Sequence, residues 1–263
     1  MWRGGPMNRP YSGFEHLAKS VLLSRWKQGR FVMLTAYFDE SRTDDGMHHK
    51  YPLVSGFVSD VEMWIAFEKE WLANASKSPN KNKRKKQNRK NRLLAEIINA
   101  YTLAPVHAAM DKKLWTPLVA ASAKSAIGKT ALGQMWSSAY GVCAYVACQL
   151  LEKWGEDSKL RKGEKIRVVF DKGNPDRPSF ERGFKAYQAN QRDSLLYDEA
   201  AFEDDETVCP LAAADVYASH LSVLYEKEKI TPSLRLLERD KTRYGGVLSE
   251  STIGKALKAM GRI

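Results

Sequence analysis

The stretch Met33-Leu-Thr-Ala-Tyr-Phe-Asp39-Glu40-Ser41 determines how the fold begins. The residues before Asp39 alternate in polarity and are rich in β-formers, so they predict a strand that ends at this aspartate. The later segment Ile166-Arg-Val-Val-Phe-Asp171 has the same character and also ends on an aspartate. Carboxylates at the ends of strands, joined by one from a packed helix, form the kind of cluster that divalent cations bind.

Hydrophobic spacing predicts further strands and helices around these two segments. Three more strands are expected, at residues 51–58, 105–110 and 195–202. Helices are expected at residues 61–74, 93–103, 134–154, 179–190, 210–225 and 249–260. The first strands form an antiparallel set, and the later ones alternate with helices as parallel crossovers do. The fold class is therefore α/β, with a mixed five-stranded sheet and helices on both faces.

The composition is that of a globular protein. The chain has 263 residues, and its apolar fraction of 43% is too high for global disorder. No apolar run reaches the ~18 residues of a membrane span, so no membrane association is expected. The three cysteines, Cys143, Cys148 and Cys209, form no CxxC pair and no zinc spacing. A disulfide framework is excluded on this pattern, and a cytoplasmic location is the natural expectation.

The formal charge of +11 is concentrated in two segments. Residues 77–92 hold nine basic residues and no acid, and residues 1–32 hold six basic residues and one acid. The run 77–92 is almost devoid of apolar residues, which predicts a solvated basic loop or the frayed start of a helix. It is either a solubilising surface run or an arm that contacts nucleic-acid phosphates. The expected contact residues are Lys83, Arg84, Lys85, Lys86, Arg89 and Lys90.

The predicted domain organisation follows from these segments. Residues 1–32 are treated as an N-terminal basic extension, because Met33 stands directly before the first strand and is a second candidate start. Residues 33–263 form the folded domain, with the basic run 77–92 as a loop insertion.

A third carboxylate, Asp215, lies within the apolar helical segment 211–219. A buried and unpaired carboxylate there costs several kcal/mol, so a base or a metal should compensate it. Asp39, Asp171 and Asp215 are therefore predicted ligands of Mg²⁺ or Mn²⁺, and two such ions would clamp a displacement at phosphorus. The structural alternatives are a hairpin cap at Asp39, an Asx turn at Asp171 and an arginine partner for Asp215.

Glu40 and the acidic run 203–206 are weaker candidates for the metal site. Glu40 points away from Asp39 if the strand continues, so it is expected to assist only as an outer ligand or base. The acidic run 203–206 precedes the segment of Asp215 and is more typical of a solvated loop. Asp204 or Asp205 is nevertheless expected to complete the metal site, and Asp205 is included among the predicted ligands.

With these residues in view, the sequence resembles the bacterial domain-of-unknown-function family 3800. The resemblance covers about residues 33–228. Its carriers are Tyr37-Phe38-Asp39-Glu40-Ser41, Gly56-Phe57-Val58, Val168-Val169-Phe170-Asp171 and the helical segment from Cys209 to Ala218. The sequence departs from the family pattern at Arg42, where glycine is usual, at Ala212, where glutamine is common, and in residues 203–207.

The resemblance implies a divergent ribonuclease H-like fold. In that fold the first strand, the fourth strand and the last core helix each supply a metal-binding acid, which matches Asp39, Asp171 and Asp215. It also implies a metal-dependent nuclease with Asp39, Glu40, Asp171 and Asp215 as catalytic residues. Family members occur near mobile elements and defence loci, which points to a nucleic-acid substrate.

Two other function classes stay open at this point. One is a non-catalytic module that binds nucleic acid or a partner on the same fold, and the other is a different phosphoryl-transfer or small-molecule enzyme that uses the same acids. Gly128-Lys129-Thr130 resembles the end of a phosphate-binding loop, but Ala123 stands where the first glycine is required. His107 and His220 are expected to be satisfied polar residues rather than ligands.

Overall fold

The computed structural model describes residues 34–41, 50–75, 83–115, 138–160, 164–172, 177–190, 194–197, 199–204 and 207–251. The strands are β1 Leu34–Glu40, β2 Leu53–Asp60, β3 Ala104–Met110, β4 Ile166–Asp171, β5 Ala201–Glu203 and β6 Tyr244–Leu248. The helices are α2 Val61–Ala75, α3 Lys83–Tyr101, α6 Ala139–Asp157, α7 Arg177–Asn190, α8 Cys209–Lys227 and α9 Pro232–Leu237.

The strands form one mixed sheet in the order β5-β4-β1-β2-β3-β6. Strands β1, β2 and β3 are antiparallel neighbours, whereas β4 runs parallel to β1 and β5 runs parallel to β4. The predicted fold class, an α/β fold with a mixed sheet, is confirmed. The predicted count of five strands is wrong, because β6 adds a sixth strand parallel to β3. Gly245 and Gly246 within β6 are more typical of a turn, which hid this strand.

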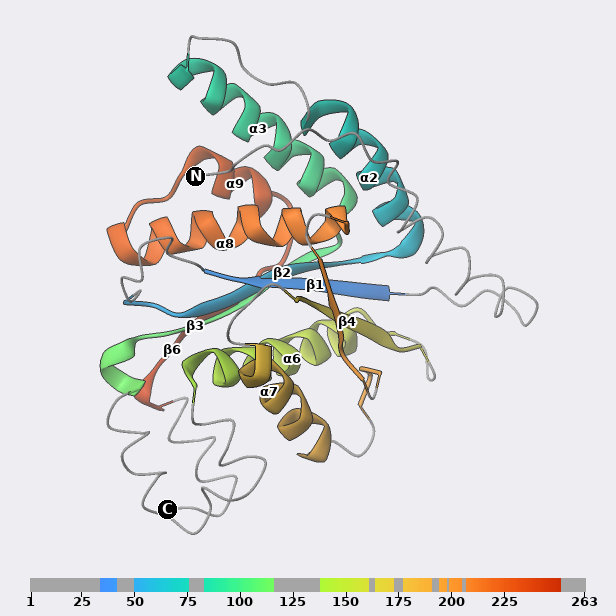
Figure 1. The fold of residues 1–263 in the computed structure, drawn as a ribbon, viewed down its shortest axis with the longest axis vertical. Coiled ribbons are helices and arrows are strands. Elements are labelled where there is room, and N and C mark those ends of the chain that lie inside the picture. Colours follow the sequence, from blue (N-terminus) through green and yellow to red (C-terminus); the bar gives the residue numbers. More distant parts are fainter. Residues whose placement is uncertain are drawn as a thin grey trace, which may run out of the picture.

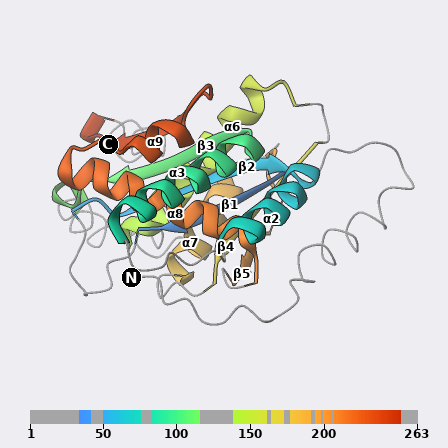
Figure 2. The same cartoon turned by 90° about the horizontal axis from the view of Figure 1, so that it is seen from above.

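Helices cover both faces of the sheet, as predicted. In Figure 1, α8, α9, α2 and α3 lie above the sheet, and α6 and α7 lie below it. The view from above in Figure 2 shows the first group spread across the sheet. Side chains alternate along β1: Ala36 and Phe38 belong to the core on the α6 side, whereas Tyr37 belongs to the core under α8. The fully buried Trp64 of α2 donates its indole N–H to the carbonyl of Thr35 at 3.0 Å.

Most predicted elements are found with shifted ends. Helix α2 follows the predicted cap, since the backbone N–H of Met63 donates to Asp60 Oδ1 at 2.8 Å. The predicted strand 195–202 is reduced to β5, with an isolated bridge between Leu196 and Ile166. Helix α9 was not predicted. The helix expected at residues 249–260 lies mostly outside the described residues.

Helix α3 changes the interpretation of the basic run. The helix begins at Lys83, ten residues before the predicted start at residue 93, so of the two alternatives for the basic run, residues 83–92 form the start of the helix rather than a loop. Its apolar second half packs against α2 and α9 and anchors it, with Leu94, Ala95, Ile97 and Ile98 buried. A tertiary anchor of this kind lets a helix extend over residues that have no buried face of their own.

In the described part of the chain, none of the helices has the length and apolarity that crossing a membrane requires.

The pairing of β1 with β2 depends on a glycine. Gly56 lies opposite Phe38, and a Cβ atom at this position would overlap the carbonyl oxygen of Tyr37. That oxygen is part of the backbone and cannot move without disturbing the strand that carries Asp39. By contrast, a Cβ at Gly246 in β6 would meet no atom within 4 Å.

We therefore expect Gly56→Ala to lower the free energy of unfolding by about 3 kcal/mol, because the methyl group must push β1 and β2 apart. Gly246→Ala is the matched control in the same sheet, and its effect should stay within about 0.5 kcal/mol. Urea unfolding followed by tryptophan fluorescence measures both. Equal effects of the two variants would contradict a close contact at Gly56.

Candidate metal centre

Three acidic side chains meet where β1 and β4 end. Because β1 and β4 are parallel and Phe38 lies opposite Phe170, the next residues, Asp39 and Asp171, lie side by side where the two strands end. Asp39, Glu40 and Asp171 each offer a carboxylate oxygen within 4.8 Å of the others. All three are buried, with exposed fractions of 7%, 4% and 7%. Buried carboxylates at this spacing are costly unless a proton or a cation compensates their charge.

Glu40 reaches the cluster although the strand continues through it. Its backbone N–H donates a 2.8 Å hydrogen bond to Asp39 Oδ1. The sequence-based expectation that Glu40 would point away from Asp39 is therefore not met: a carboxylate oxygen of Glu40 lies among those of the other two acids.

The pKa of Asp39 is raised well above its ordinary value. Burial is the main cause, followed by the charge of Glu40, a side-chain hydrogen bond with Glu40 and the charge of Asp215. The hydrogen bond from the backbone N–H of Glu40 acts in the opposite direction. The cluster therefore disfavours a full set of negative charges in the absence of a cation.

Asp215 approaches the cluster from above the sheet. It lies in the first half of α8, which packs on β1 and β2, and its side chain is half-buried. Its charge contributes to the raised pKa of Asp39, so the two carboxylates are close enough to interact. Asp215 is not part of the group that closes to within 4.8 Å, and it stands at the edge of the cluster.

Glu203 lies beside the acid cluster, although the sequence analysis did not predict it there. It was assigned to a solvated acidic loop, but it ends β5 and lies opposite Asp171 in the parallel register. Burial is the main cause of the raised pKa of Tyr37, and the charges of Glu203 and Glu68 raise it further. The signal that could have found it is the same one that selected Asp39 and Asp171, namely an acid that directly follows a strand.

Of the two acids predicted to complete the metal site, Asp204 alone belongs to the described residues. Asp204 forms an ion pair with Lys172 at 2.9 Å, so its carboxylate already has a cationic partner. Asp205, the predicted fourth ligand, lies outside the described residues.

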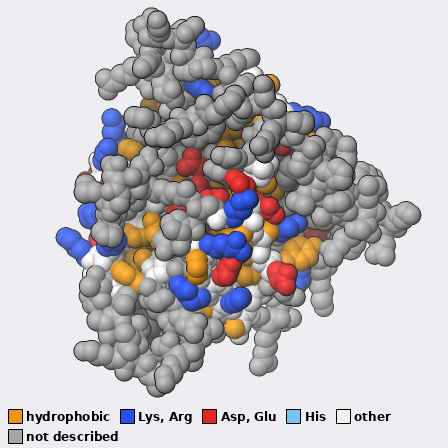
Figure 3. Space-filling model, in the orientation of Figure 1, with side chains coloured by type: hydrophobic (Ala, Val, Ile, Leu, Met, Phe, Trp, Pro, Cys, Tyr) orange, Lys and Arg blue, Asp and Glu red, His pale blue; other side chains and the backbone are white. Residues whose placement is uncertain are grey.

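The predicted phosphate-binding residues all lie on α3. Arg89 is exposed and Lys90 is half-buried, whereas the side chains of Lys83, Arg84, Lys85 and Lys86 lie outside the described residues. Helix α3 begins on the side of the molecule toward which β1 runs and ends at the other side (Figure 1). On the face shown in Figure 3, acidic and basic side chains of the described residues are interspersed rather than separated.

A polar network holds α8 on the sheet beside the cluster. The ring of His107 on β3 is fully buried between two tyrosines of α8, with Tyr217 Oη 3.2 Å from Nδ1 and Tyr225 Oη 2.6 Å from Nε2. The hydroxyl of Tyr217 also donates to Glu238 at 2.8 Å, and Glu238 pairs with Arg243 at 3.3 Å. His107 is thus a satisfied polar residue, as predicted. The network fixes the helix that carries Asp215.

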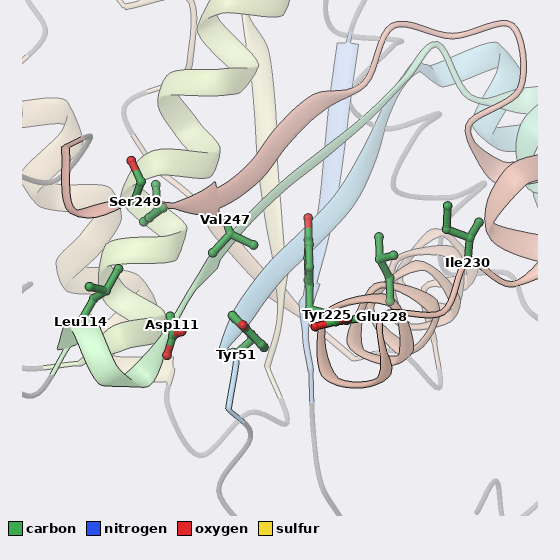
Figure 4. A pocket seen from close by; sticks show the side chains of 10 residues that line it. Tyr51, Asp111, Leu114, Tyr225, Glu228, Ile230, Val247 and Ser249 are labelled. Carbon is green, nitrogen blue, oxygen red and sulfur yellow. The ribbon is translucent and has the colours of Figure 1, made fainter.

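A separate hollow of about 580 Å³ lies at the same end of the sheet, toward β6. Tyr51 and Tyr225 are neighbours there, with ring centroids 5.9 Å apart, and Val247 lies nearby (Figure 4). The residues that line it are Tyr51, Asp111, Leu114, Leu224, Tyr225, Glu228, Ile230, Val247, Leu248 and Ser249. None of the three clustered acids lines this hollow, so the two features are distinct.

No family model and no curated protein matches the chain in sequence. Among solved structures, the chain is similar to the crystal structure of Bst-RNase HIII in complex with Mn²⁺, with a TM-score of 0.46 and 12% sequence identity. The similarity covers 86% of this chain and 60% of that one, so the chain spans less than two thirds of the length of that protein.

The pKa of His107 yields a prediction about pH. Burial, with a smaller contribution from the charge of Arg243, lowers this pKa from 6.5 to about 3. The unfolded chain takes up a proton below pH 6.5 and the folded chain does not, so stability is present above this pH and is lost as the pH falls toward 3. We expect His107 to contribute a loss of about 3 kcal/mol between pH 7 and pH 4.

Chemical unfolding of the parent and of His107→Gln across this pH range measures the effect. The variant should be less stable at pH 7 but should show a flatter pH dependence, because glutamine does not titrate. Parallel curves for the two proteins would exclude this role of His107.

A further prediction concerns the effect on stability of the negative charges gathered in the acid cluster. Asp39→Asn keeps the acceptor of the Glu40 N–H and removes one carboxylate, so the metal-free protein should become more stable by about 1 kcal/mol. A carboxyl whose pKa is raised on folding costs stability as the pH rises above 3.8, so the gain should be larger at pH 8 than at pH 5. Thermal unfolding in EDTA at both pH values measures it.

Asp157→Asn is the control, because Asp157 is an exposed aspartate paired with Lys153. It should change stability little and, if anything, lower it. A loss of stability in Asp39→Asn that is the same at both pH values would show that the cluster is not strained by charge.

Proposed function

We propose that the chain is a metal-dependent nuclease that hydrolyses phosphodiester bonds of nucleic acid. The observation that carries the proposal is the buried group of Asp39, Glu40 and Asp171, whose carboxylate oxygens lie within 4.8 Å of one another at one edge of the sheet. A fold gains no stability from collecting three buried acids, so a function that needs them is the better explanation.

The donor set fits Mg²⁺ or Mn²⁺. All donors are carboxylate oxygens, which suit these hard cations, and neither histidine nor cysteine belongs to the group. Asp39 and Asp171 would be the central ligands, because two hydrogen-bonded strands fix their positions. Glu40 would be a further ligand, Asp215 would close the site from α8, and Asp205 stays a candidate from the sequence alone.

When bound, one or two such ions would lower the pKa of an attacking water and stabilise the leaving oxygen of a phosphodiester. The residues of the chain would bind and orient. Helix α8 would cover the cluster and limit the access of water to it, and the His107 network would keep the helix in place.

Nucleic acid is the proposed partner because of the basic helix α3. Its first turns carry the run of lysine and arginine residues, and its axis leads them toward the side of the molecule where β1 ends. Lys83, Arg84, Lys85, Lys86, Arg89 and Lys90 would contact backbone phosphates without reading the sequence. The membership of family 3800, the cytoplasmic location and the role of residues 1–32 as an extension stay predictions.

Cleavage assays test the proposal. The purified protein should cut at least one of single-stranded DNA, duplex DNA, single-stranded RNA, duplex RNA or an RNA–DNA hybrid in Mg²⁺ or Mn²⁺, and EDTA should abolish the cut. Asp39→Asn and Asp171→Asn should each lower the rate by at least about 100-fold, because both remove a proposed metal ligand. Asp157→Asn should cleave like the parent.

Two outcomes would overturn the nuclease assignment. Cleavage that survives in Asp39→Asn and Asp171→Asn would place the activity elsewhere or in a contaminant. Salt-sensitive binding of nucleic acid with no cleavage in either metal would favour the alternative of a non-catalytic binding module on the same fold.

A further inference from the structure

Two buried serines beside the acid cluster have hydroxyl groups without partners. Ser55 on β2 is 0% exposed and Ser41, directly after β1, is 3% exposed. Neither Oγ atom has a hydrogen-bond partner among the described residues. A buried hydroxyl without a hydrogen bond is unfavourable in a folded protein, so the missing hydrogen bonds of these two serines need an explanation.

The sheet register directs both serines to the cluster. Ser55 lies directly opposite Asp39 in the antiparallel pair of β1 and β2. Side chains of such pairs stand on the same face with Cβ atoms about 5 Å apart. The backbone N–H of Ser41 donates to the carbonyl of Leu53 at 3.2 Å, which continues the ladder by one residue. Alternation along the strand then places Ser41 on the face of Asp39 as well.

Another serine of the same strand shows that a partner is normally available on this face. Ser59 lies four residues after Ser55 in β2 and is also 0% exposed. Its hydroxyl donates to the carbonyl of Tyr101 at 2.7 Å. The serine away from the acids is therefore satisfied by the fold, whereas the serine opposite Asp39 is not. This difference between Ser59 and Ser55 indicates that the hydrogen-bond partner of Ser55 is supplied when a ligand binds to the acid cluster.

We propose that Ser55 is a positioning residue of the metal centre: once a cation draws the Asp39 carboxylate into its bound position, the Ser55 hydroxyl would donate a hydrogen bond to that carboxylate and accept one from a water on the cation, neither of which the metal-free structure contains. The inference rests on the proposed function, because it requires a cation at the cluster. Magnesium and manganese keep several waters when few protein ligands hold them. A hydroxyl is suited to this place because it donates and accepts at once. Ser41, two residues after Asp39 on the same face of the sheet, has an equivalent role.

Metal affinity and metal-free stability together test the role of Ser55. By calorimetry, Ser55→Ala should bind Mn²⁺ at least about 10-fold more weakly than the parent, as is typical when a partner of a metal ligand is lost. In EDTA the same variant should melt at the same temperature as the parent or higher, since it loses an unpartnered hydroxyl. Ser55→Cys should weaken Mn²⁺ binding in the same way without leaving a cavity.

Ser59→Ala is the matched control on the same strand and face. It should bind Mn²⁺ like the parent but melt about 2–4 °C lower in EDTA, because it leaves the Tyr101 carbonyl without its donor. Ser55→Ala should thus lose Mn²⁺ affinity and keep its melting temperature, whereas Ser59→Ala should do the opposite. A purely structural role of Ser55 would not produce this difference. Ser41→Ala should follow Ser55→Ala in both measurements.

Three results would overturn the proposal, and they are distinguishable. If the parent binds Mn²⁺ and Ser55→Ala binds it equally well, the role of Ser55 fails and the metal centre stands. If Ser55→Ala melts lower in EDTA by as much as Ser59→Ala, its hydroxyl has a structural partner and the role also fails. If the parent itself does not bind Mn²⁺, the proposed metal centre fails, and the role of Ser55 fails with it.

Discussion

The parallel pairing of β1 with β4 is the constraint on which the rest of the molecule depends. The register that sets Phe38 against Phe170 brings two chain segments more than a hundred residues apart to end at one edge. Each strand contributes an apolar side chain to the core just before it contributes an acid to the edge. The same backbone hydrogen bonds therefore stabilise the sheet and hold the acids at a fixed distance from one another.

Holding acids together in this way works against stability. Burial and the neighbouring charges raise the pKa of Asp39, so the folded chain disfavours the ionised state that a metal ligand requires. The rest of the fold compensates for this cost elsewhere, with two large apolar cores on the two faces of the sheet. Strain of this kind is common at functional sites, where binding of the ligand relieves it.

Helix α8 links the site to the far part of the sheet. It carries Asp215 near its start and the two tyrosines that bind His107 further along. Across the sheet, Asp39, Ser55 and His107 are consecutive partners in the strand registers and share the face under this helix. The arrangement makes the position of Asp215 depend on the packing of His107 on β3, two strands away from β1.

Much of the fold could be predicted from local patterns. The strands that end at Asp39 and Asp171, the helix capped by Asp60 and the helix of Asp215 all have clear periodicity, and each is found close to its predicted place. The helical state of the basic first half of α3 was left open against a loop, and strand β6 was not predicted, because the local signals of both segments oppose their structure. The basic start of α3 has no apolar face, and the paired glycines of β6 are typical of turns.

The sequence by itself determined that the strands of Asp39 and Asp171 carry acids at their ends, because alternation and the terminal aspartates are local properties. Only the tertiary structure decided which acids meet. It brought the Glu40 carboxylate to the cluster, placed Glu203 beside Asp171, paired Asp204 with Lys172 and set Ser55 opposite Asp39. The physical reason is that register between distant strands is fixed by the summed packing of both sheet faces, which no single segment of the chain contains.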